Sequence, residues 1–412
     1  MKINFDLIMK TNLSYIFIRC INVIYIVTGI TFGLYFFKQG LNFESGDYIA
    51  HYLKWFNHAK TLGFVEALST DYTDYPYGFE LFLYIFSLIP LESFDIDGYK
   101  PLWNIKIMIY FFYILIPISS YFIVKYCTND KYLCAKTFFI TSISPTIILN
   151  SAVWGQMDCI WVSLLLFSLN FLIRAKYALF FLFIGFAISM KQTTILFLPF
   201  VFLMILKKKE INLYHILFFL IGLILLSLPS LLAMKTFNIL LPYIYESKIT
   251  NALVANFSNI YSLFTVSPLW YSWFIDPMYT KIFLFMCVGI LIILIADLNY
   301  KEFELNPSNM MLLATMFFVV VCNFLPGIHD RYMLFADVSS VLYVIISRKS
   351  KDIWIPIFIN FVSAFNCINY LKGIAVELSS ARIVMVQLVS IGFFAFTIYL
   401  IYYSFNIIKN IK

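Results

Sequence analysis

Charged residues are scarce in this chain of 412 residues: they make up 12% of it, whereas apolar residues make up 62% and the mean hydropathy is +0.87. A soluble domain carries about 25% charged and roughly 45–50% apolar residues. The chain has too few polar side chains to cover a folded surface in water, so lipid must cover much of it. Intrinsic disorder is excluded as well, since disordered segments combine low hydrophobicity with high charge.

Several motifs of soluble enzymes and binding proteins are missing. The seven cysteines show no pair at the two-residue spacing of zinc and redox motifs, and the sequence has no Walker-type or other glycine-rich nucleotide loop. No histidines occupy i and i+4 positions, so we predict no metal site and no cofactor, with a divalent ion left open as an alternative. The net charge of +7 is spread over many short loops, which argues against nucleic-acid binding.

Long apolar runs are what the chain has instead. A helix needs about 20 apolar residues to cross the hydrocarbon core of a bilayer. The stretch 177–206 is interrupted at Lys191, which predicts two short helices that meet at a polar break. The run 79–90 is too short to span comfortably and is expected to enter and return. We therefore expect an all-α polytopic membrane protein with about 12 spans in a single integral membrane domain, residues 1–412. The other runs lie at 14–37, 104–124, 137–153, 156–173, 212–233, 281–298, 309–326, 332–347, 353–370 and 382–405.

The distribution of charge predicts the orientation. The outer loops, among them the two long segments 38–78 and 234–280, hold most of the acids and are predicted to be extracytoplasmic, whereas cations gather in the short loops of the other face, as the positive-inside rule requires. Both termini are then cytoplasmic. If 79–90 spans and 177–206 crosses once, the cations of loop 125–136 fall on the wrong face. The sixteen cations of the short loops are Lys2, Lys10, Lys125, Lys131, Lys136, Arg174, Lys176, Lys207, Lys208, Lys209, Lys301, Arg348, Lys349, Lys351, Lys409 and Lys412.

Both long segments are rich in aromatic and polar residues, so we expect them to form short interfacial helices at the membrane surface. The stretch from Tyr48 to Leu62 is amphipathic at helical spacing. It serves either as an interfacial anchor or as the floor of a catalytic cavity. Its apolar face is predicted to comprise Ile49, Tyr52, Leu53, Phe56 and Ala59.

Ionisable residues beside membrane spans are costly and often mark functional sites. Asp47, just beyond the first run, is either the N-cap of the following helix or a base for a substrate hydroxyl. Tyr75 and Tyr77 either stack on sugar rings or anchor the chain at the headgroup level. Lys191 either snorkels to the interface or binds an anionic phosphate at the helix break.

Two further clusters fall on the same predicted face. In Trp154-Gly155-Gln156-Met157-Asp158 the amide and carboxylate suit hydroxyl groups, although the segment also reads as a plain turn with an aspartate N-cap. In His329-Asp330-Arg331-Tyr332 the guanidinium suits bidentate binding of phosphate. The alternative is that Arg331 is a structural partner of Asp330 or Asp337. One carboxylate and several cations at one face favour chemistry on a phosphate-linked lipid.

These elements resemble the GT-C superfamily of polytopic glycosyltransferases that use polyprenyl-phosphate sugars, and most of all the bacterial relatives of the second GPI mannosyltransferase. The resemblance covers most of the chain in order. The chain has Asp330 where the family usually has Glu, and Tyr77 where it usually has a second Pro. The elements that carry the resemblance are Ser45-Gly46-Asp47-Tyr48 with Trp55, Tyr75-Pro76-Tyr77-Gly78, Trp154 to Ile160, Lys191-Gln192, Asn256 to Tyr261 and His329 to Tyr332.

The resemblance implies a GT-C-type helical bundle and a metal-independent inverting transfer of mannose or a related hexose to a glycan or glycolipid acceptor. By this similarity Asp47 is the general base, and Arg331, Lys191 and His329 hold the donor phosphate. The implied sugar or acceptor contacts are Trp154, Gln156, Asp158, Tyr75, Tyr77 and Asn256.

Two rival functions share the cationic cavity: a transporter or flippase of polyprenyl-linked glycans, and a polysaccharide polymerase. A transporter predicts internal repeats and polar residues at both faces, whereas here they gather on one face. A polymerase predicts paired arginines in the outer loops, where this chain has Arg331 and Arg382. The partners expected are the lipid bilayer, a polyprenyl-phosphate donor and a glycan acceptor. The richness in Ile, Lys and Asn favours a bacterial inner (plasma) membrane location.

Overall fold

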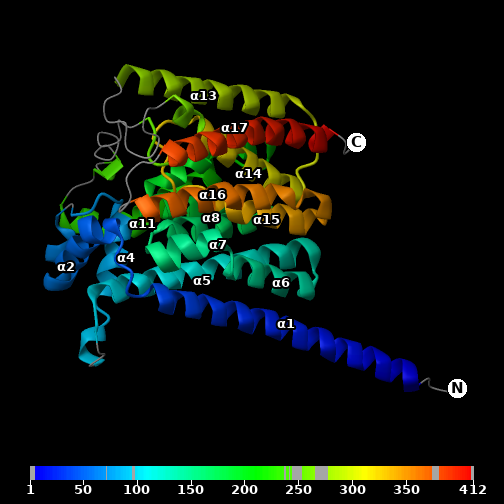
Figure 1. Cartoon of the computed structure of the whole chain (residues 1–412), viewed down its shortest axis with the longest axis horizontal. Coiled ribbons are helices and arrows are strands. Elements are labelled where there is room, and N and C mark those ends of the chain that lie inside the picture. The colour runs from blue at the N-terminus through cyan, green and yellow to red at the C-terminus, as the bar shows by residue number, and fades with distance from the viewer. Residues whose placement is uncertain are drawn as a thin grey trace.

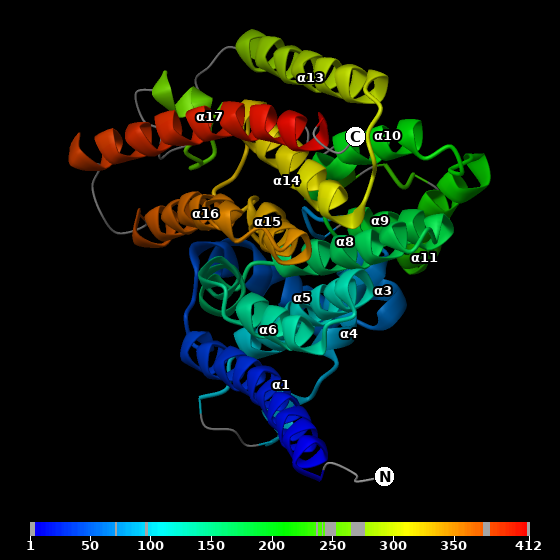
Figure 2. The same cartoon turned by 90° about the vertical axis from the view of Figure 1, so that its right-hand side faces the viewer.

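The computed structural model describes residues 5–70, 72–94, 98–235, 238–240, 242–243, 253–264, 277–373 and 380–409. Within these residues the chain is helical apart from loops and turns, and its only extended pairing is a set of bridges from Ala255 and Asn256 to His329. The prediction of an all-α fold is therefore confirmed. Most long helices run side by side as a bundle, with α1 (Phe5–Gly40) along one edge and α13 (Pro277–Tyr300) along the opposite edge (Figures 1 and 2).

The first half of the bundle carries several short or irregular helices between its long ones. They follow α1 as η1 (Tyr48–Tyr52), α2 (Leu53–Thr61), α3 (Phe64–Leu68), α4 (Tyr77–Ser87), η2 (Leu91–Phe94), α5 (Pro101–Thr128), α6 (Lys131–Ser142), α7 (Pro145–Ile147), η3 (Ile148–Trp154), α8 (Asp158–Ile173), α9 (Tyr177–Met190), η4 (Gln192–Phe197), α10 (Leu198–Lys207) and α11 (Leu213–Ala233). Both η1 and η3 are π-helical.

The second half is more regular. Besides α13 it contains η5 (Ile260–Leu263), α14 (Pro307–Phe324), α15 (Leu334–Ser347), η6 (Ser350–Asp352), α16 (Trp354–Gly373) and α17 (Ser380–Lys409). Most of the predicted second outer loop, 234–280, lies outside the described residues.

Eight helices of the described chain are long and apolar enough to cross a membrane, and the bent pair Lys131–Ser142 and Pro145–Trp154, with 41° between its halves, makes a ninth if it counts as one span. The protein is thus a multi-pass integral membrane protein. Four shorter apolar helices, α8, α9, η4 with α10, and α15, complete the bundle. The expected number of about 12 spans stays a prediction.

The polar break at Lys191 is where the sequence predicts it. Lys191 pairs with Asp158 at the start of α8, so α9 runs toward that end of the bundle. Lys207, at the far end of α10, donates to the carbonyl groups of Asn299 and Lys301 at the end of α13. The two short helices of 177–206 therefore meet at the break and run in opposite directions along the bundle.

Helix α4 has both of its ends near the same end of the bundle. Its first turn packs against the end of α9, where a Cβ added to Gly78 would lie 2.7 Å from the carbonyl oxygen of Ser189. Its last turn meets the first turns of α5, because Asn104 Nδ2 donates to the carbonyl groups of Phe86 and Ile89 at 3.1 and 2.9 Å. The stretch Tyr77–Phe94, which contains α4, is also one of the eight candidate spans, so the entry and return of 79–90 stays a prediction.

The short basic loops gather at one end of the bundle. Arg348, after α15, lies 3.6 Å from Asp130, before α6, and Lys207 bonds the loop that follows α13. The start of α1 and the end of α17 lie at this end as well (Figure 1). Arg331 precedes α15 and Arg348 follows it, so this helix separates the site arginine from a basic loop.

The segment that follows α1 folds into short helices, as expected. In η1 and α2, Tyr52, Phe56 and Ala59 are buried, and so is Trp55, which the predicted face did not include. Ile49 is 58% exposed, so the predicted apolar face is buried only in part. The π-helical turn at Tyr48–Tyr52 explains the difference, because it breaks the 3.6-residue period on which that face was drawn.

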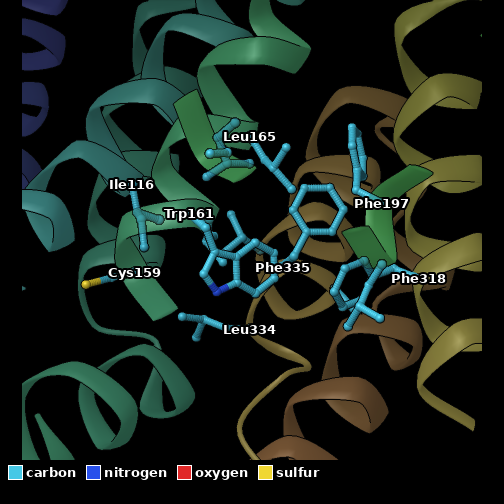
Figure 3. Packing of buried hydrophobic residues seen from close by; sticks show 14 of the residues in the cluster. Ile116, Cys159, Trp161, Leu165, Phe197, Phe318, Leu334 and Phe335 are labelled. Atoms are coloured by element: carbon cyan, nitrogen blue, oxygen red, sulfur yellow. The ribbon is translucent and has the colours of Figure 1, made fainter. Parts of the chain in front are cut away.

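An aromatic core lies beside the polar end of the bundle. Trp161 of α8 stacks on Phe318 of α14 with ring centroids 5.9 Å apart, and Phe335 of α15 contacts both Phe318 and Phe197 at 5.1 Å (Figure 3). The indole nitrogen of Trp161 points out of this core and donates to Asp158. The packing thus joins α8, η4, α14 and α15 next to Asp158.

Candidate active site

The carboxylate of Asp47 does not cap the helix that follows it. Ser45 Oγ accepts the backbone N–H of Tyr48 at 3.3 Å instead, and the Asp47 side chain makes no capping bond. Asp47 Oδ2 accepts hydrogen bonds from Trp154 Nε1, at 2.9 Å, and from Gln156 Nε2. The side chain is 21% exposed. Of the two readings of Asp47, the structure excludes the N-cap.

Local backbone geometry aims both donors at Asp47. The π-helix η3 ends at Trp154, and Gly155 then adopts φ +80°, a left-handed conformation that suits glycine. The backbone N–H of Gln156 closes the turn on the carbonyl group of Asn150 at 2.9 Å. Gln156 Oε1 accepts from Tyr52 Oη at 2.9 Å. Because the amide oxygen is occupied in this way, its nitrogen faces the carboxylate.

The second carboxylate, Asp158, is fully buried and fully bonded. Its oxygens accept from Lys191 Nζ at 2.6 Å, from Trp161 Nε1 at 3.0 Å and from Asn150 Nδ2 at 3.1 Å. Its side chain makes no N-cap bond to α8, and the Lys191 side chain is 2% exposed. The readings of Asp158 as a plain helix cap and of Lys191 as a snorkelling cation are therefore both wrong.

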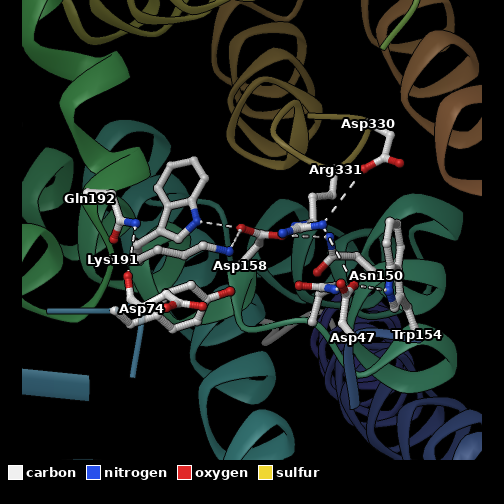
Figure 4. Close-up of polar contacts among 12 residues, drawn as sticks. Asp47, Asp74, Asn150, Trp154, Asp158, Lys191, Gln192, Asp330 and Arg331 are labelled. Carbon is white, nitrogen blue, oxygen red and sulfur yellow. Dashed lines mark hydrogen bonds and ion pairs between the residues drawn. The ribbon is translucent and has the colours of Figure 1, made fainter. Parts of the chain in front are cut away.

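Arg331 lies between the two carboxylates (Figure 4). Its Nη1 is 3.7 Å from Asp47 Oδ2, its Nε is 3.7 Å from Asp158 Oδ2, and Nη1 is 4.0 Å from Asp330 Oδ1. The separations from Asp47 and Asp158 allow electrostatic attraction but exceed hydrogen-bond length. Among the described residues, the buried Arg331 Nε finds no hydrogen-bond partner. Electrostatic attraction to the carboxylates therefore holds the guanidinium, and its Nε–H group remains able to donate.

Backbone contacts with the second long loop hold the turn that carries Arg331. Asp330 N donates to the carbonyl group of Ala255 at 3.2 Å, and Asn256 is bridged to His329 through the backbone. Burial, with Arg331 and Lys191 nearby, holds the pKa of His329 well below its usual range. The imidazole is therefore neutral at pH 7, and toward a phosphate it acts as an N–H donor rather than as a cation.

Aromatic rings surround the cations of the site. Lys191 Nζ lies 5.1 Å from the ring centroid of Tyr75 and 5.8 Å from that of Tyr332, while the Arg331 guanidinium lies 5.5 Å from the Trp154 ring. Tyr75 Oη also meets Tyr52 Oη at 3.3 Å. The buried Tyr75 is thus part of the site and not of an aromatic belt. Cation–π contacts of this kind strengthen when water is excluded.

The structure brings together seven of the ten residues singled out from the sequence. These are Asp47, Tyr75, Trp154, Gln156, Asp158, Lys191 and Arg331, all linked by the contacts above. His329 and Asn256 lie on the adjoining turn and loop. Tyr77 is buried in the first turn of α4, a position that argues against an anchor at the headgroup level.

Several site residues escaped sequence analysis. Tyr52 was assigned only to an apolar face, yet its hydroxyl group orients Gln156. Asn150, and a buried lysine at position 106, are polar residues inside apolar runs, which is a signal that the sequence does contain. Tyr370 stacks on Trp154 with centroids 4.3 Å apart. Nothing in the local sequence marks Tyr370, because the pairing joins residues far apart in the chain.

Among the described residues, no group of three His, Cys, Asp or Glu side chains is arranged to hold a metal ion. No family model matches the chain, and no curated protein shows significant similarity to it. The resemblance to GT-C glycosyltransferases therefore rests on the motifs of the sequence, and the argument for function rests on the geometry of the site.

Proposed function

We propose that this membrane protein is an inverting glycosyltransferase of the GT-C type. It transfers a sugar, mannose or a related hexose, from a polyprenyl-phosphate donor to a lipid-linked or surface glycan acceptor at the extracytoplasmic face. The reaction uses Asp47 as general base and Arg331 as the principal ligand of the donor phosphate. Lys191 and His329 contribute from nearby, and no metal is required.

The proposal rests mainly on the surroundings of the Asp47 carboxylate. Its hydrogen bonds come from the N–H groups of Trp154 and Gln156. It is the more exposed of the two carboxylates, at 21% against 0% for Asp158. A partly accessible carboxylate held by N–H donors is suited to accept a proton from a hydroxyl group.

The proposed step is a single displacement. Asp47 takes the proton of the acceptor hydroxyl, whose oxygen forms a bond to the anomeric carbon. The bond from that carbon to the phosphate oxygen breaks, and the electron pair leaves with the lipid phosphate. Arg331 stabilises the charge that develops on this leaving group. Since no protein nucleophile takes part, the configuration at the anomeric carbon inverts, by the same one-step logic as in inverting glycosidases.

Binding of the donor must change the pairing of Arg331. Its attraction to Asp47 and Asp158 acts without hydrogen bonds, so a phosphate that offers bidentate bonds competes with them. Lys191, by contrast, is engaged at 2.6 Å with Asp158 and nearly inaccessible. This difference favours Arg331 as the direct phosphate ligand and Lys191 as a contributor to the local positive potential.

The test is transfer by purified protein in proteoliposomes. A radiolabelled sugar on a polyprenyl monophosphate is offered with a lipid-linked acceptor, and the corresponding nucleotide sugar is offered in parallel. We expect transfer from the lipid donor alone, with inversion at the anomeric carbon. Movement of the lipid-linked sugar across the bilayer without transfer would instead identify a flippase, and elongation of one lipid-linked glycan by another would identify a polymerase.

A further inference from the structure

A lysine that no motif includes is buried next to the site. Lys106, in the second turn of α5, is 1% exposed. Its Nζ donates to the carbonyl groups of Ala152 and Val153, both at 2.8 Å, and within the described chain it forms no ion pair. A buried ammonium without a carboxylate is costly. Within the described chain, the two carbonyl groups are the acceptors of its hydrogen bonds.

Those carbonyl groups belong to the last turn of η3. The C-terminal carbonyls of a helix lack intrahelical partners and carry partial negative charge, so a cation there is favourable. The chain then passes so close to the lysine that a Cβ at Gly155 would lie 3.0 Å from Lys106 Nζ. Lys106 thus contacts the backbone on both sides of Trp154.

The end of α1 packs against the same place. A Cβ added to Gly40 would lie 2.0 Å from the carbonyl oxygen of Ala152, the oxygen that also accepts from Lys106. Gly40 leads into the loop that carries Asp47. The Ala152 carbonyl group, which accepts a hydrogen bond from Lys106, therefore lies against the end of α1. The loop with Asp47 follows this end of α1, and Trp154 follows Ala152 by two residues.

We propose that Lys106 is a positioning residue. Its ammonium group fixes the end of η3, and thereby sets Trp154 Nε1 and Gln156 Nε2 at hydrogen-bonding distance from Asp47. The consequence for catalysis rests on the proposed function of Asp47, whereas the effect on the hydrogen bond itself does not.

The direct test observes the indole N–H of Trp154 by ¹⁵N–¹H NMR of tryptophan-labelled protein, with the resonance assigned by Trp154→Phe. In wild type we expect a hydrogen-bonded indole signal that shifts in Asp47→Asn. Lys106→Met removes the ammonium at similar size, and it should move or broaden the Trp154 signal while other indole signals stay in place. Lys125→Met, on the same helix but exposed at its other end, is the matched control.

The second test uses kinetics of glycosyl transfer. Misplacing a catalytic group by about 1 Å costs on the order of a hundredfold, so Lys106→Met should lower kcat by about tenfold to a hundredfold with little change in donor KM.

Lys106→Gln keeps two N–H donors without the charge and should retain more of the Trp154 signal and of kcat than Lys106→Met. An unchanged Trp154 signal in Lys106→Met overturns the proposal, and so does a failure of both variants to fold, since Lys106 then acts in folding. If wild type transfers no sugar while the Trp154 signal still depends on Lys106, the proposed function is wrong but the positioning role stands.

Discussion

Asp47 and Asp158 lie on either side of one arginine, yet their surroundings differ. Arg331 is 3.7 Å from each carboxylate. Asp158 is completely buried and forms a 2.6 Å ion pair with Lys191, whereas Asp47 is 21% exposed and bonded by neutral donors. We call the Asp158 side closed, because its carboxylate is buried and paired with the buried Lys191. We call the Asp47 side open, because part of its carboxylate remains accessible to an incoming hydroxyl group.

The two carboxylates share residue type and distance from Arg331, so their roles differ because their burial and their bonding partners differ. A buried ion pair is strongly destabilised when one partner is removed, so Asp158 serves to hold α8 and the break at Lys191 together. A half-open carboxylate held by N–H groups contributes less to the fold and more to chemistry. Variants that exchange or remove these features test the comparison.

The largest effect is expected from Asp47→Asn. The amide keeps the shape of the side chain but accepts no proton, and general-base catalysis contributes about 10²–10⁴-fold. Turnover should therefore fall at least a hundredfold, while thermal unfolding in detergent and binding of a polyprenyl-phosphate analogue stay near wild type. Near-normal turnover in the purified variant would show that Asp47, like Asp158, has a structural role and not a catalytic one.

Asp158→Asn should act on stability first. It leaves the Lys191 ammonium buried without a counter-ion, which costs about 3–5 kcal/mol. The double variant Asp158→Asn with Lys191→Met removes both charges and should recover most of the loss in thermal unfolding. Asp74→Asn, which disturbs the half-exposed pair with His51, is the control and should change stability by less than about 1 kcal/mol. Equal losses of stability in Asp158→Asn and Asp74→Asn would contradict the structural role of the Asp158–Lys191 pair.

Arg331 links the two sides, and its variants should mainly affect the donor. Arg331→Ala removes the bidentate fork and should weaken binding of a polyprenyl-phosphate analogue by about tenfold or more, since a charge-assisted hydrogen bond contributes about 1.5–3 kcal/mol. Arg331→Lys keeps the charge and should weaken binding less. A folded, monodisperse Arg331→Ala that binds the analogue as tightly as wild type would show that Arg331 serves only to balance the carboxylates.

The smallest effect concerns Asp330, the third carboxyl group near Arg331. Burial raises its pKa well above the usual range. A raised folded-state pKa means that the stability associated with the neutral acid is present below the unfolded pKa of about 3.9 and is lost as pH rises toward the folded value. Asp330→Asn is neutral at every pH, so it should raise the melting temperature by a few degrees at pH 7 and little at pH 4. A gain of the same size at both pH values would contradict this explanation.

Much of the architecture was accessible from the sequence. Apolar runs predicted the helices, and the polar interruption at Lys191 predicted the break between α9 and η4. The same sequence left the roles of Asp47, Asp158 and Lys191 open, because capping, snorkelling and catalysis require the same residue types at the same spacing. Only the tertiary partners decide among them: the N–H groups that reach Asp47, and the ion pair that joins Asp158 to Lys191 across 33 positions.

The parts that failed have a common physical origin. The apolar face of Tyr48–Leu62 was predicted at the α-helical period, which the π-helical turn Tyr48–Tyr52 interrupts. Tyr52 and Tyr370 gained their roles from residues far along the chain, Gln156 and Trp154. Local patterns report which side chains are apolar, but not which distant hydroxyl group or ring will face them.

The two π-helical turns have a consequence for evolutionary comparison. A π-turn closes its hydrogen bond over one residue more than an α-turn, so η1 and η3 each hold one residue beyond what a regular helix would place there. Removing one residue from η3 would turn all that follows by roughly 100° about the helix axis and carry Trp154 away from Asp47. Related sequences that build this helix regularly should therefore align with a one-residue gap just before the Trp-Gly-Gln segment, and such a gap would mark proteins in which a different group faces the base.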